Sequence, residues 1–578
     1  MESQKISQDL NLALEASQRE RNQSLDLNTG YEAEGERWNV IIQYVGNILE
    51  LETEDIQITP LLGNYAVVNL PQSQLGDFAR NPQVIFVEKP KSLFFAVEAG
   101  RRISCISPVQ SYPLELKGKG ILACCIDSGI DYMHEDFRNP DGSTRILRLW
   151  DQSIPGNPPE GYRIGTEYTK EQIDEAIRAE SFQERRSLVP SVDNSGHGTA
   201  VMGIFAGNGA QSQGLYRGVA TESELLVVKL GVSRERGFPR TTELIQAVDY
   251  AVKQGIALGM PMVINLSFGN SYGSHSGTSL VETYLNTAAN TGQTTICVGT
   301  GNEGVSGTHA SGILNNEQIQ EIELGIGAYE PSLNVQIWKN YQDQMRIYLQ
   351  NPSGEVIGPL EQILEAQRFR LGNTELLVYY GEPTPYSGAQ EVYVEFLPTL
   401  DYLDEGIWTI RLEGRRILQG EYDLWLPGGG VLGKDTKFIR PTPERTLTIP
   451  STALQVISVG AYNAQLQSYA DFSGRGYTRN IVQIKPDLSA PGVNIQTTRA
   501  GGGYEAVTGT SFAVPFVSGS AALLMEWGIV RGNDAYLYGE KVKSYLINGA
   551  RQIPGEREWP NPRFGWGVLC LRDSIPFG

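Results

Sequence analysis

The sequence contains no long apolar run and no secretory leader pattern. Its N-terminus, Met1-Glu-Ser-Gln-Lys-Ile-Ser-Gln-Asp-Leu, has no basic stretch followed by an apolar segment, so we expect no Sec signal peptide. It has no stretch of 18 apolar residues, so we expect no membrane-spanning helix and no membrane partner. These absences predict a protein that stays inside the cell.

Cysteine and histidine are both scarce. The five cysteines are odd in number and show no metal-ligand spacing. Cys124 and Cys125 are adjacent in an apolar run, and neighbouring residues of a strand point to opposite faces. We therefore expect reduced core cysteines, as is usual in a reducing compartment, and no metal site. The four histidines, which narrow the choice of a catalytic base, are His134, His197, His275 and His309.

Positive charge is also in deficit. Lys and Arg number 47 against 66 Asp and Glu, which gives a net charge of −19 and makes nucleic acid an unexpected partner. The composition, with 40% apolar and 20% charged residues, is that of an ordinary soluble protein. At 578 residues, without an internal repeat or low-complexity segment, the chain is long enough for two to four domains.

The first part of the chain predicts a small α+β unit. Residues 1–30 are polar and offer little to pack, and we expect them to be an extension. Strands are predicted from Trp38 and at 65–70 and 84–89, and a helix is predicted to begin at Pro71. We place this N-terminal domain at residues 1–98, with the folded unit at about 35–98.

The next part alternates strands with helices. Continuous apolar runs occur at 120–126, 225–230, 262–266 and 294–298. Strands of this kind are buried on both faces, which predicts a parallel sheet covered by helices. We assign this α/β domain to residues 99–311 and, where the pattern resumes, to residues 431–578.

Residues 312–430 interrupt that rhythm with short strands in which apolar and polar residues alternate. These runs are separated by turn sequences such as Asn351-Pro-Ser-Gly. The pattern predicts an antiparallel β-sandwich inserted into the α/β domain. The expected strands lie at 318–324, 333–338, 345–349, 375–380, 391–396 and 407–412.

Three segments combine residues of the kind that nucleophilic catalysis requires. Asp127 ends a buried strand, which is where open α/β sheets place their sites. His197 opens an apolar helix between two glycines, and Ser511 stands at the N-terminus of another, where the helix dipole favours negative charge. A serine needs a base to remove its proton, and the base needs an acid to fix its tautomer. Each segment alone is more simply a turn, a loop or a helix cap, so the prediction rests on their conjunction.

The segments Ile126-Asp127-Ser-Gly, Ser195-Gly-His197-Gly-Thr and Gly509-Thr-Ser511 resemble the signatures of the subtilisin-like (S8) serine proteases. The resemblance implies a subtilisin-like fold with Asp127, His197 and Ser511 as triad, and it implies that Asn302 donates to the oxyanion. It also implies a substrate-binding surface formed by Ser267, Phe268, Gly269, Gly299, Thr300 and Gly301. The sequence departs from the family at Val514 and Phe516. Because the sandwich follows soon after Asn302, we expect the residues that normally close the base of the S1 pocket in this family to be displaced or replaced.

The order of domains resembles that of the Csp-type germination proteases of endospore-forming anaerobes. That resemblance implies an α/β fold with an N-terminal α+β prodomain and a jelly-roll-like inserted sandwich. It implies a spore-associated bacterial endopeptidase that removes its own propeptide in cis and activates a protein zymogen such as a cortex-lytic hydrolase. We expect an extended, apolar prodomain end and autocleavage between about residues 94 and 102.

Two other functions remain open at this stage. The chain could be a pseudoprotease that uses the fold for binding or signalling, although all three triad residues are present. It could also be a general intracellular subtilase. We expect no required cofactor. The segment His134-Glu-Asp136 leaves a calcium site open, because the family can use this Asp as a calcium ligand.

Overall fold

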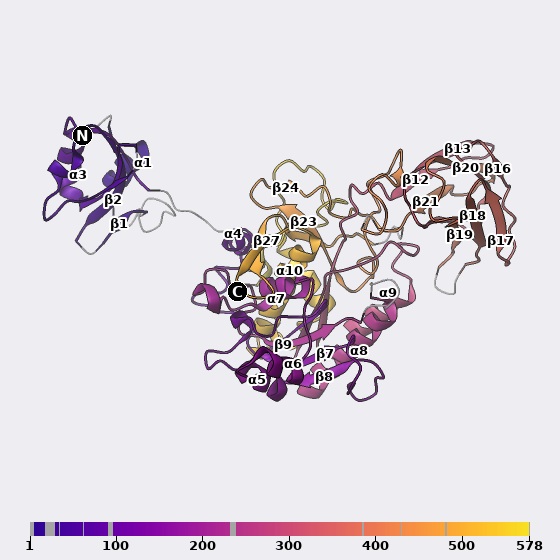
Figure 1. Ribbon diagram of the computed structural model, residues 1–578, viewed down its shortest axis with the longest axis horizontal. Coiled ribbons are helices and arrows are strands. Elements are labelled where there is room, and N and C mark those ends of the chain that lie inside the picture. The colour runs from indigo at the N-terminus through magenta and orange to yellow at the C-terminus, as the bar shows by residue number, and fades with distance from the viewer. Residues whose placement is uncertain are drawn as a thin grey trace. The chain divides into compact units, whose positions relative to one another are not determined.

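The computed structural model describes residues 5–17, 29–33, 35–61, 63–90, 96–231, 239–383, 387–428, 430–479 and 483–576 (Figure 1). The chain divides into two compact units, Met1–Phe95 and Ala96–Gly578. We call them unit 1 and unit 2 and describe each by itself.

Unit 1 is built on one antiparallel sheet with the strand order β1-β2-β4-β3, in which β5 also pairs with β2. In β2, Trp38, Val40 and Ile42 are buried and their neighbours are more exposed, which is the alternation of a sheet with one covered face. The elements are α1 (Gln8–Glu15), β1 (Tyr31–Glu32), β2 (Arg37–Tyr44), η1 (Ile48–Leu51), β3 (Gln57–Leu61), β4 (Tyr65–Pro71), α3 (Gln72–Arg80) and β5 (Val84–Glu88).

The expectation that residues 1–30 do not pack is wrong for the start of the chain. Ile6, Leu10 and Ala13 are buried in the same core as Trp38 and Val40. They are spaced i, i+4 and i+7, so they lie on one face of α1 and its approach. The surrounding polar residues hid this stripe, because only one face of a short surface helix needs to be apolar.

Unit 2 is centred on a mixed sheet with the strand order β24-β23-β11-β10-β6-β9-β7-β8, and β25 also pairs with β23. The predicted parallel core is confirmed, since the β10–β6, β6–β9, β10–β11 and β11–β23 pairs are all parallel. The strands are β6 (Leu122–Asp127), β7 (Ile146–Asp151), β8 (Thr166–Thr169), β9 (Glu224–Lys229), β10 (Met262–Leu266), β11 (Thr294–Gly299), β23 (Ile457–Asn463), β24 (Ser468–Tyr469) and β25 (Leu488–Pro491).

Helices cover both faces of this sheet, so β6 is buried along its whole length. Ala123 and Cys125 pack into one core with α7 and α10, whereas Leu122, Cys124 and Ile126 pack into another with α8 and α9. The helices are α4 (Ala96–Ile103), α5 (Lys170–Arg178), α6 (Phe182–Leu188), α7 (His197–Ala206), α8 (Thr241–Leu258), α9 (Leu280–Ala289), α10 (Thr510–Met525), α11 (Glu540–Asn548) and α12 (Leu571–Ser574). Smaller elements are η2 (Glu135–Phe137), η3 (Ala210–Ser212), β26 (Ile495–Thr498), β27 (Tyr504–Val507) and η4 (Glu526–Val530).

One described helix, Thr510–Val530, is long and apolar enough by length and composition to cross a membrane. Most of it is buried inside unit 2, where α10 packs against α7 and the central sheet. Its apolar composition is therefore explained by its position in the protein core.

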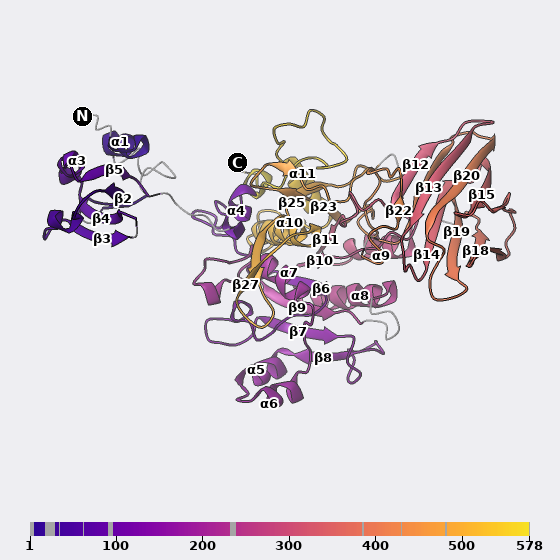
Figure 2. The same cartoon turned by 45° about the horizontal axis from the view of Figure 1, so that its top comes forward.

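Residues 309–438 form two antiparallel sheets, which we call the two-sheet region (Figure 2). One sheet has the order β12-β21-β14-β19-β18-β17 and the other β16-β15-β20-β13-β22, and both contribute to one hydrophobic core. The strands are β12 (His309–Ile313), β13 (Ile319–Ile326), β14 (Leu333–Asn340), β15 (Gln344–Gln350), β16 (Val356–Ile357), β17 (Gln367–Leu371), β18 (Thr374–Tyr380), β19 (Ala389–Pro398), β20 (Gly406–Arg416), β21 (Glu421–Trp425) and β22 (Lys437–Phe438).

The pairing of strands in this region is nested: β12 pairs with β21, β13 with β20 and β14 with β19. All six predicted strands are present, but the sheets extend beyond the predicted bounds of 312–430 at both ends. The extra strands β12 and β22 are short and carry no clear alternation, which is why the pattern missed them.

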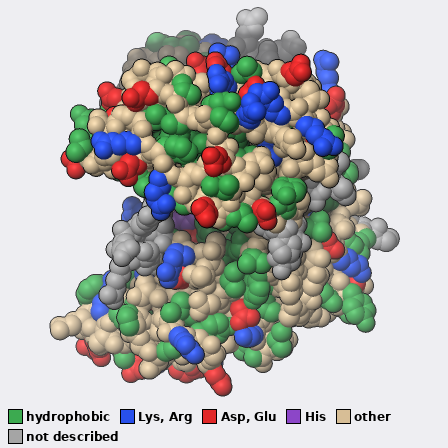
Figure 3. Space-filling model, turned by 90° about the vertical axis from the view of Figure 1, so that its right-hand side faces the viewer, with side chains coloured by type: hydrophobic (Ala, Val, Ile, Leu, Met, Phe, Trp, Pro, Cys, Tyr) green, Lys and Arg blue, Asp and Glu red, His purple; other side chains and the backbone are tan. Residues whose placement is uncertain are grey.

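On the face seen in Figure 3, acidic and basic side chains are intermixed among hydrophobic ones.

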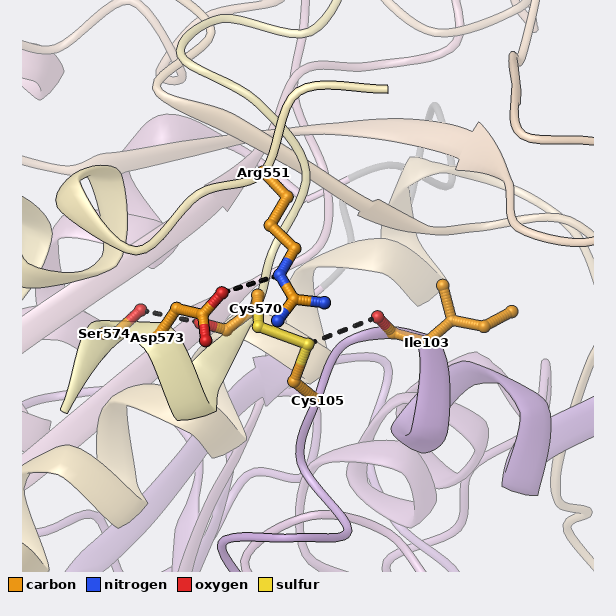
Figure 4. Close-up of a disulfide and its surroundings, with 6 residues drawn as sticks. All are labelled: Ile103, Cys105, Arg551, Cys570, Asp573 and Ser574. Carbon is orange, nitrogen blue, oxygen red and sulfur yellow. Dashed lines mark hydrogen bonds and ion pairs between the residues drawn. A yellow bond between two sulfur atoms is a disulfide. The ribbon is translucent and has the colours of Figure 1, made fainter. Parts of the chain in front are cut away.

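The expectation that all cysteines are reduced is wrong for two of the five. Cys105, just after α4, is bonded to Cys570, just before α12, across a sequence separation of 465 residues (Figure 4). The fold brings their Cα atoms to 4.8 Å, which is within the range for a disulfide. Cys124, Cys125 and Cys297 are free and buried. Sequence spacing gives no sign of a bond between segments so far apart.

Thiol titration tests this bond. The unfolded, unreduced protein should show three free thiols, rising to five after reduction. Cys105→Ser should lower the free energy of unfolding by about 2–5 kcal/mol, because the unfolded chain loses its cross-link. Urea denaturation measures this loss, and reductant should lower the wild-type midpoint while leaving the Cys105→Ser midpoint in place. Five free thiols before reduction would contradict the disulfide.

Candidate active site

Asp127 lies at the C-terminal end of the central strand β6, where it is almost completely buried. Its Oδ1 accepts a hydrogen bond from the Ser128 backbone N–H at 2.7 Å. β6 is flanked by β9 and β10, so the carboxylate is held at the edge of the sheet where the other parallel strands also end.

His197 is the first residue of α7, whose first turn passes very close to the loop after β6. A Cβ at Gly198 would lie 2.2 Å from the carbonyl oxygen of Gly129, so only glycine permits this approach. The close contact brings His197 Nδ1 to 2.7 Å from Asp127 Oδ1. The structure thus joins two of the predicted triad residues.

The charge balance around His197 is dominated by two opposing effects. Burial disfavours the charged imidazolium, but the adjacent Asp127 carboxylate, its hydrogen bond and the nearby Asp193 together raise the pKa of His197 above its usual value. With Nδ1–H donated to Asp127, the other ring nitrogen, Nε2, has the lone pair that accepts a proton.

Asp193 organises this corner and was not predicted from the sequence. Its Oδ2 accepts from the Thr199 backbone N–H at 2.8 Å, and its Oδ1 accepts from the Gly196 N–H at 3.0 Å and from Ser128 Oγ at 2.8 Å. Asp193 therefore satisfies N–H groups at the start of α7 and ties that helix to the residue after Asp127. The available signal was an Asp four residues before the histidine that opens a helix.

Ser511 is the second residue of α10 and faces the end of β10. Its Oγ donates to the Ser267 carbonyl oxygen at 2.9 Å, and Ser267 Oγ donates to the Ser511 carbonyl oxygen at 2.9 Å. The ring of the following residue, Phe512, lies 5.4 Å from the His197 ring. The reciprocal pair fixes the start of α10 against the residue that follows β10.

Asn302 is oriented by the same helix start. Its Oδ1 accepts from the Thr510 backbone N–H at 3.1 Å and from Thr510 Oγ1 at 3.1 Å. With its oxygen committed to Thr510, the side chain has its amide N–H groups to offer a ligand. Asn302, Thr510 and Ser511 all line the same pocket.

That pocket has a volume of about 600 Å³ and includes most of the predicted substrate-binding surface. The predicted residues that line it are Ser267, Phe268, Gly269, Gly299 and Gly301. The sixth, Thr300, does not line it: its side chain is fully buried and its hydroxyl lies 3.3 Å from Ser473 Oγ. Because successive residues of an extended chain point to opposite sides, Thr300 faces the interior while its two glycine neighbours face the pocket.

The pocket also contains residues that the sequence did not indicate. Asn270 and Tyr272 line it from the loop after β10, and Glu303 lines it from the segment after Asn302. Gly428, Gly430 and Val431 line it from the two-sheet region, just after β21. No local pattern could have identified these last three, because they come from a different part of the chain.

The segment around His134 holds a buried carboxylate. Asp136 accepts from Tyr504 Oη at 3.0 and 2.9 Å and from the Gln211 backbone N–H at 3.0 Å. Burial raises the pKa of Asp136 above its usual value, and these hydrogen bonds oppose the shift without cancelling it. His134 Nε2 lies 3.0 Å from the Gly503 carbonyl oxygen. Within the described part of the chain, no group of three or more His, Cys, Asp or Glu residues is placed to hold a metal ion.

Comparison with known families matches both units. Residues 4–91 match the Csp protease B prodomain, and residues 118–354 and 439–567 match the subtilase family. The unmatched interval between the two subtilase segments lies in the two-sheet region.

The chain is similar to the solved structure of the Clostridium perfringens CspB protease. The identity is 36%, the TM-score is 0.76, and the match covers 82% of this chain and 96% of that one. It is 25% identical over 501 residues to the minor extracellular protease Vpr of Bacillus subtilis, covering 80% of this chain and 52% of that protein. It is 22% identical over 472 residues to a PII-type proteinase of Lactococcus lactis subsp. cremoris, covering 75% of this chain and 24% of that protein. The chain therefore spans about half or less of the length of these two curated relatives.

The matched family segments decide the assignment. The chain belongs to the subtilase family, with a Csp protease B prodomain at its N-terminus.

Proposed function

We propose that this protein is a serine endopeptidase in which Ser511 is the nucleophile, His197 the general base and Asp127 the residue that orients His197. The observation that carries the proposal is the 2.7 Å contact between His197 Nδ1 and Asp127 Oδ1 beside the helix start that bears Ser511. Acyl transfer by serine requires this set of an acid, a base and a hydroxyl.

The proposed proton transfer follows from the hydrogen-bond partners of Ser511 and His197. Ser511 Oγ leaves the Ser267 carbonyl and attacks the carbon of the scissile peptide bond, while its proton passes to His197 Nε2. When the intermediate collapses, the carbon–nitrogen bond breaks and His197 returns the proton to the leaving amine. Water repeats the sequence on the acyl-enzyme. Asp127 keeps Nδ1 protonated and stabilises the imidazolium that forms.

The negative oxygen of the intermediate needs donors that are already in place. Asn302 supplies side-chain N–H groups, and the Ser511 backbone N–H lies at the first turn of α10, where N–H groups have no helical partner. The hydrogen bonds from Thr510 to Asn302 Oδ1 hold the amide in this orientation, so little reorganisation is needed during the reaction.

Unit 1 supports autoprocessing, since it matches a Csp protease B prodomain. One face of its sheet leaves Ile41, Val67, Ile85 and Phe86 partly exposed, an apolar surface of the kind that binds protein.

The predicted cleavage interval of 94–102 includes residues outside those described and most of α4. Residues 96–103 are helical, so the expectation that the end of the prodomain is extended is wrong for these residues. Gly100 of this helix packs against Phe516. We therefore place the cut N-terminal to α4.

We further propose that the two-sheet region is an inserted, jelly-roll-like sandwich. Its nested strand pairing and its shared core support this assignment. The similarity to a CspB protease supports limited proteolysis of a protein zymogen, such as a cortex-lytic hydrolase, in the spores of a bacterium. The bounds proposed for the subtilase domain are 99–311 and 431–578; β12 crosses the first junction, and β22 lies a few residues after the second.

The main alternative is a catalytically silent subtilase fold used for binding. The Asp127–His197 contact and the ordered Asn302 favour an enzyme, because a binding module has no need of them. A general intracellular subtilase would share the chemistry and differ in substrate. Digestion of casein would favour that function, whereas cleavage of one zymogen without digestion of casein would favour the germination role.

Labelling with a fluorophosphonate tests the nucleophile. The wild-type protein should be labelled and should appear as two fragments, because the reactive serine also cuts the chain before α4. Ser511→Ala should remain a single unlabelled chain, as seen by gel electrophoresis and mass spectrometry. An unlabelled, uncut wild type would support the silent alternative.

The oxyanion role of Asn302 predicts a loss of turnover. Asn302→Ala should lower kcat by about 10²–10³-fold with a smaller change in KM, since the donor acts mainly in the transition state. Steady-state cleavage of a peptide substrate measures both constants, and thermal unfolding shows whether the variant is folded. A folded variant with unchanged kcat would rule out this role.

The raised pKa of His197 predicts the acid limb of the pH profile. His197 must be neutral to accept a proton, so kcat/KM should fall as pH decreases, with a midpoint above the usual 6.5. Asp127→Asn removes the negative charge that stabilises the imidazolium, so its midpoint should move to lower pH while kcat falls by about 10⁴-fold. An unmoved or higher midpoint in the variant would contradict the assigned pair.

A further inference from the structure

The pocket beside Ser511 has one wall that comes from the two-sheet region. Strand β21 ends at Trp425, and the chain that follows passes the pocket, where Gly428, Gly430 and Val431 line it. The opposite wall carries Ser267, which follows β10, and Gly299, which ends β11. The space next to the nucleophile is therefore enclosed between the central sheet and the two-sheet region.

The two-sheet region also positions a second wall of the pocket, the loop after β10. Asn270 and Tyr272 lie on the loop after β10, and the backbone N–H of Gly273 in that loop donates to Gln336 Oε1 of β14 at 2.9 Å. Gln336 is buried, so this bond is protected from water and costly to break.

A stack of three buried rings fixes the same loop at another point. The Trp425 ring lies between His275, with centroids 4.1 Å apart and planes at 15°, and His309, at 4.9 Å and 18°. His275 Nε2 lies 3.1 Å from the Ser271 carbonyl oxygen, next to the pocket residue Tyr272. The stack thus links the pocket loop directly to β21, and Trp425 Nε1 donates to the Arg445 carbonyl oxygen at 3.2 Å.

Strand β21 is itself anchored by a buried carboxylate. Asp423 accepts from His309 Nε2 at 3.0 Å and pairs with Arg445 at 3.1 Å and with Arg479 at 2.9 Å. Arg479 belongs to the segment after β24, and its backbone N–H donates to the His275 carbonyl oxygen at 3.0 Å. These contacts fix β21, and with it the segment that lines the pocket, to the body of unit 2.

We propose that the two-sheet region determines which P1 side chain this protease accepts. It does so directly through Gly428, Gly430 and Val431, and indirectly by holding the Asn270–Tyr272 loop through Gln336 and Trp425. The proposal rests on the proposed function, since it assigns the P1 subsite to the pocket beside Ser511.

The lining indicates the class of side chain that fits. Two glycines on the two-sheet side leave room for a long side chain, and among the described residues that line the pocket Glu303 is the one that carries a charge. A Cβ at Gly428 would already lie 3.1 Å from Glu303 Oε1, so the two walls meet at that carboxylate. The subsite therefore favours long neutral or basic P1 side chains over acidic ones.

Gly430→Leu tests the direct wall. A Cβ at Gly430 would meet nothing within 4 Å and its φ is not in the left-handed region, so the variant should fold while its side chain fills the pocket. For peptides with P1 Arg, Gln or Phe, kcat/KM should fall by more than about tenfold, with less effect for P1 Ala. Gly388→Leu, which also meets nothing within 4 Å and lies in the same region outside the pocket lining, is the matched control and should leave the P1 profile unchanged.

Gln336→Met tests the indirect wall. It removes the acceptor for the Gly273 N–H while nearly preserving side-chain volume, and it should weaken discrimination between long and short P1 residues by roughly five- to tenfold. Gln367→Met is the control, because Gln367 is also buried in the two-sheet region and its amide, among the residues that the structure describes, bonds to Glu361 of the same region. Thermal unfolding should show a comparable loss of stability in both, so a change of P1 profile in Gln336→Met alone separates positioning from stability.

Binding separates this inference from the proposed chemistry. Peptide acids that differ only in the terminal residue are titrated into the full-length Ser511→Ala protein with and without Gly430→Leu. If the wild type neither cleaves nor labels but Gly430→Leu selectively weakens binding of long terminal residues, the proteolytic function fails and the subsite stands. If Gly430→Leu alters neither the cleavage profile nor the binding profile, the inference is overturned.

Discussion

The first turn of α7 lies against the loop after β6, and this contact sets the geometry on which the rest of the site depends. Gly198 allows the approach because a side chain there would overlap the Gly129 carbonyl. As a result, His197 reaches Asp127, and Asp193 satisfies N–H groups at the start of α7 while bonding Ser128 beside the same carboxylate. Because these contacts all involve the start of α7, a displacement of that helix would lengthen several of these short bonds at once.

The nucleophile is supported by a buried chain of polar groups. Ser518 Oγ donates to Asn265 Oδ1, Asn265 Nδ2 donates to Ser267 Oγ, and Ser267 Oγ donates to the Ser511 carbonyl, each at 2.8 to 2.9 Å. Such a network stabilises a structure only when every member is paired, and it then permits one arrangement of the helix start. The network runs from the middle of α10 through β10 back to Ser511. The position of Ser511 is therefore coupled to the packing of α10 on β10 in the core of unit 2.

The two-sheet region is continuous with that structure in a way that its sequence did not suggest. Trp425 stacks between a histidine that follows β10 and a histidine that begins β12, and Gln336 holds the same loop. Aromatic stacking adds specificity of orientation to the area it buries. The region is therefore built against the pocket rather than attached at a distance, which explains why pocket residues lie on both sides of a long stretch of sheet.

The sequence by itself determined the elements whose signals are local. Apolar runs such as 262–266 indicated buried parallel strands, alternation indicated the antiparallel sheets, and the motifs around Asp127, His197 and Ser511 indicated the family. Only the tertiary structure decided the pairing of Cys105 with Cys570, the role of Asp193 and the contribution of Gly430 to the pocket. The physical reason is that these depend on contacts between segments far apart in the chain, and the free energy of such contacts leaves no periodicity in the residues that make them.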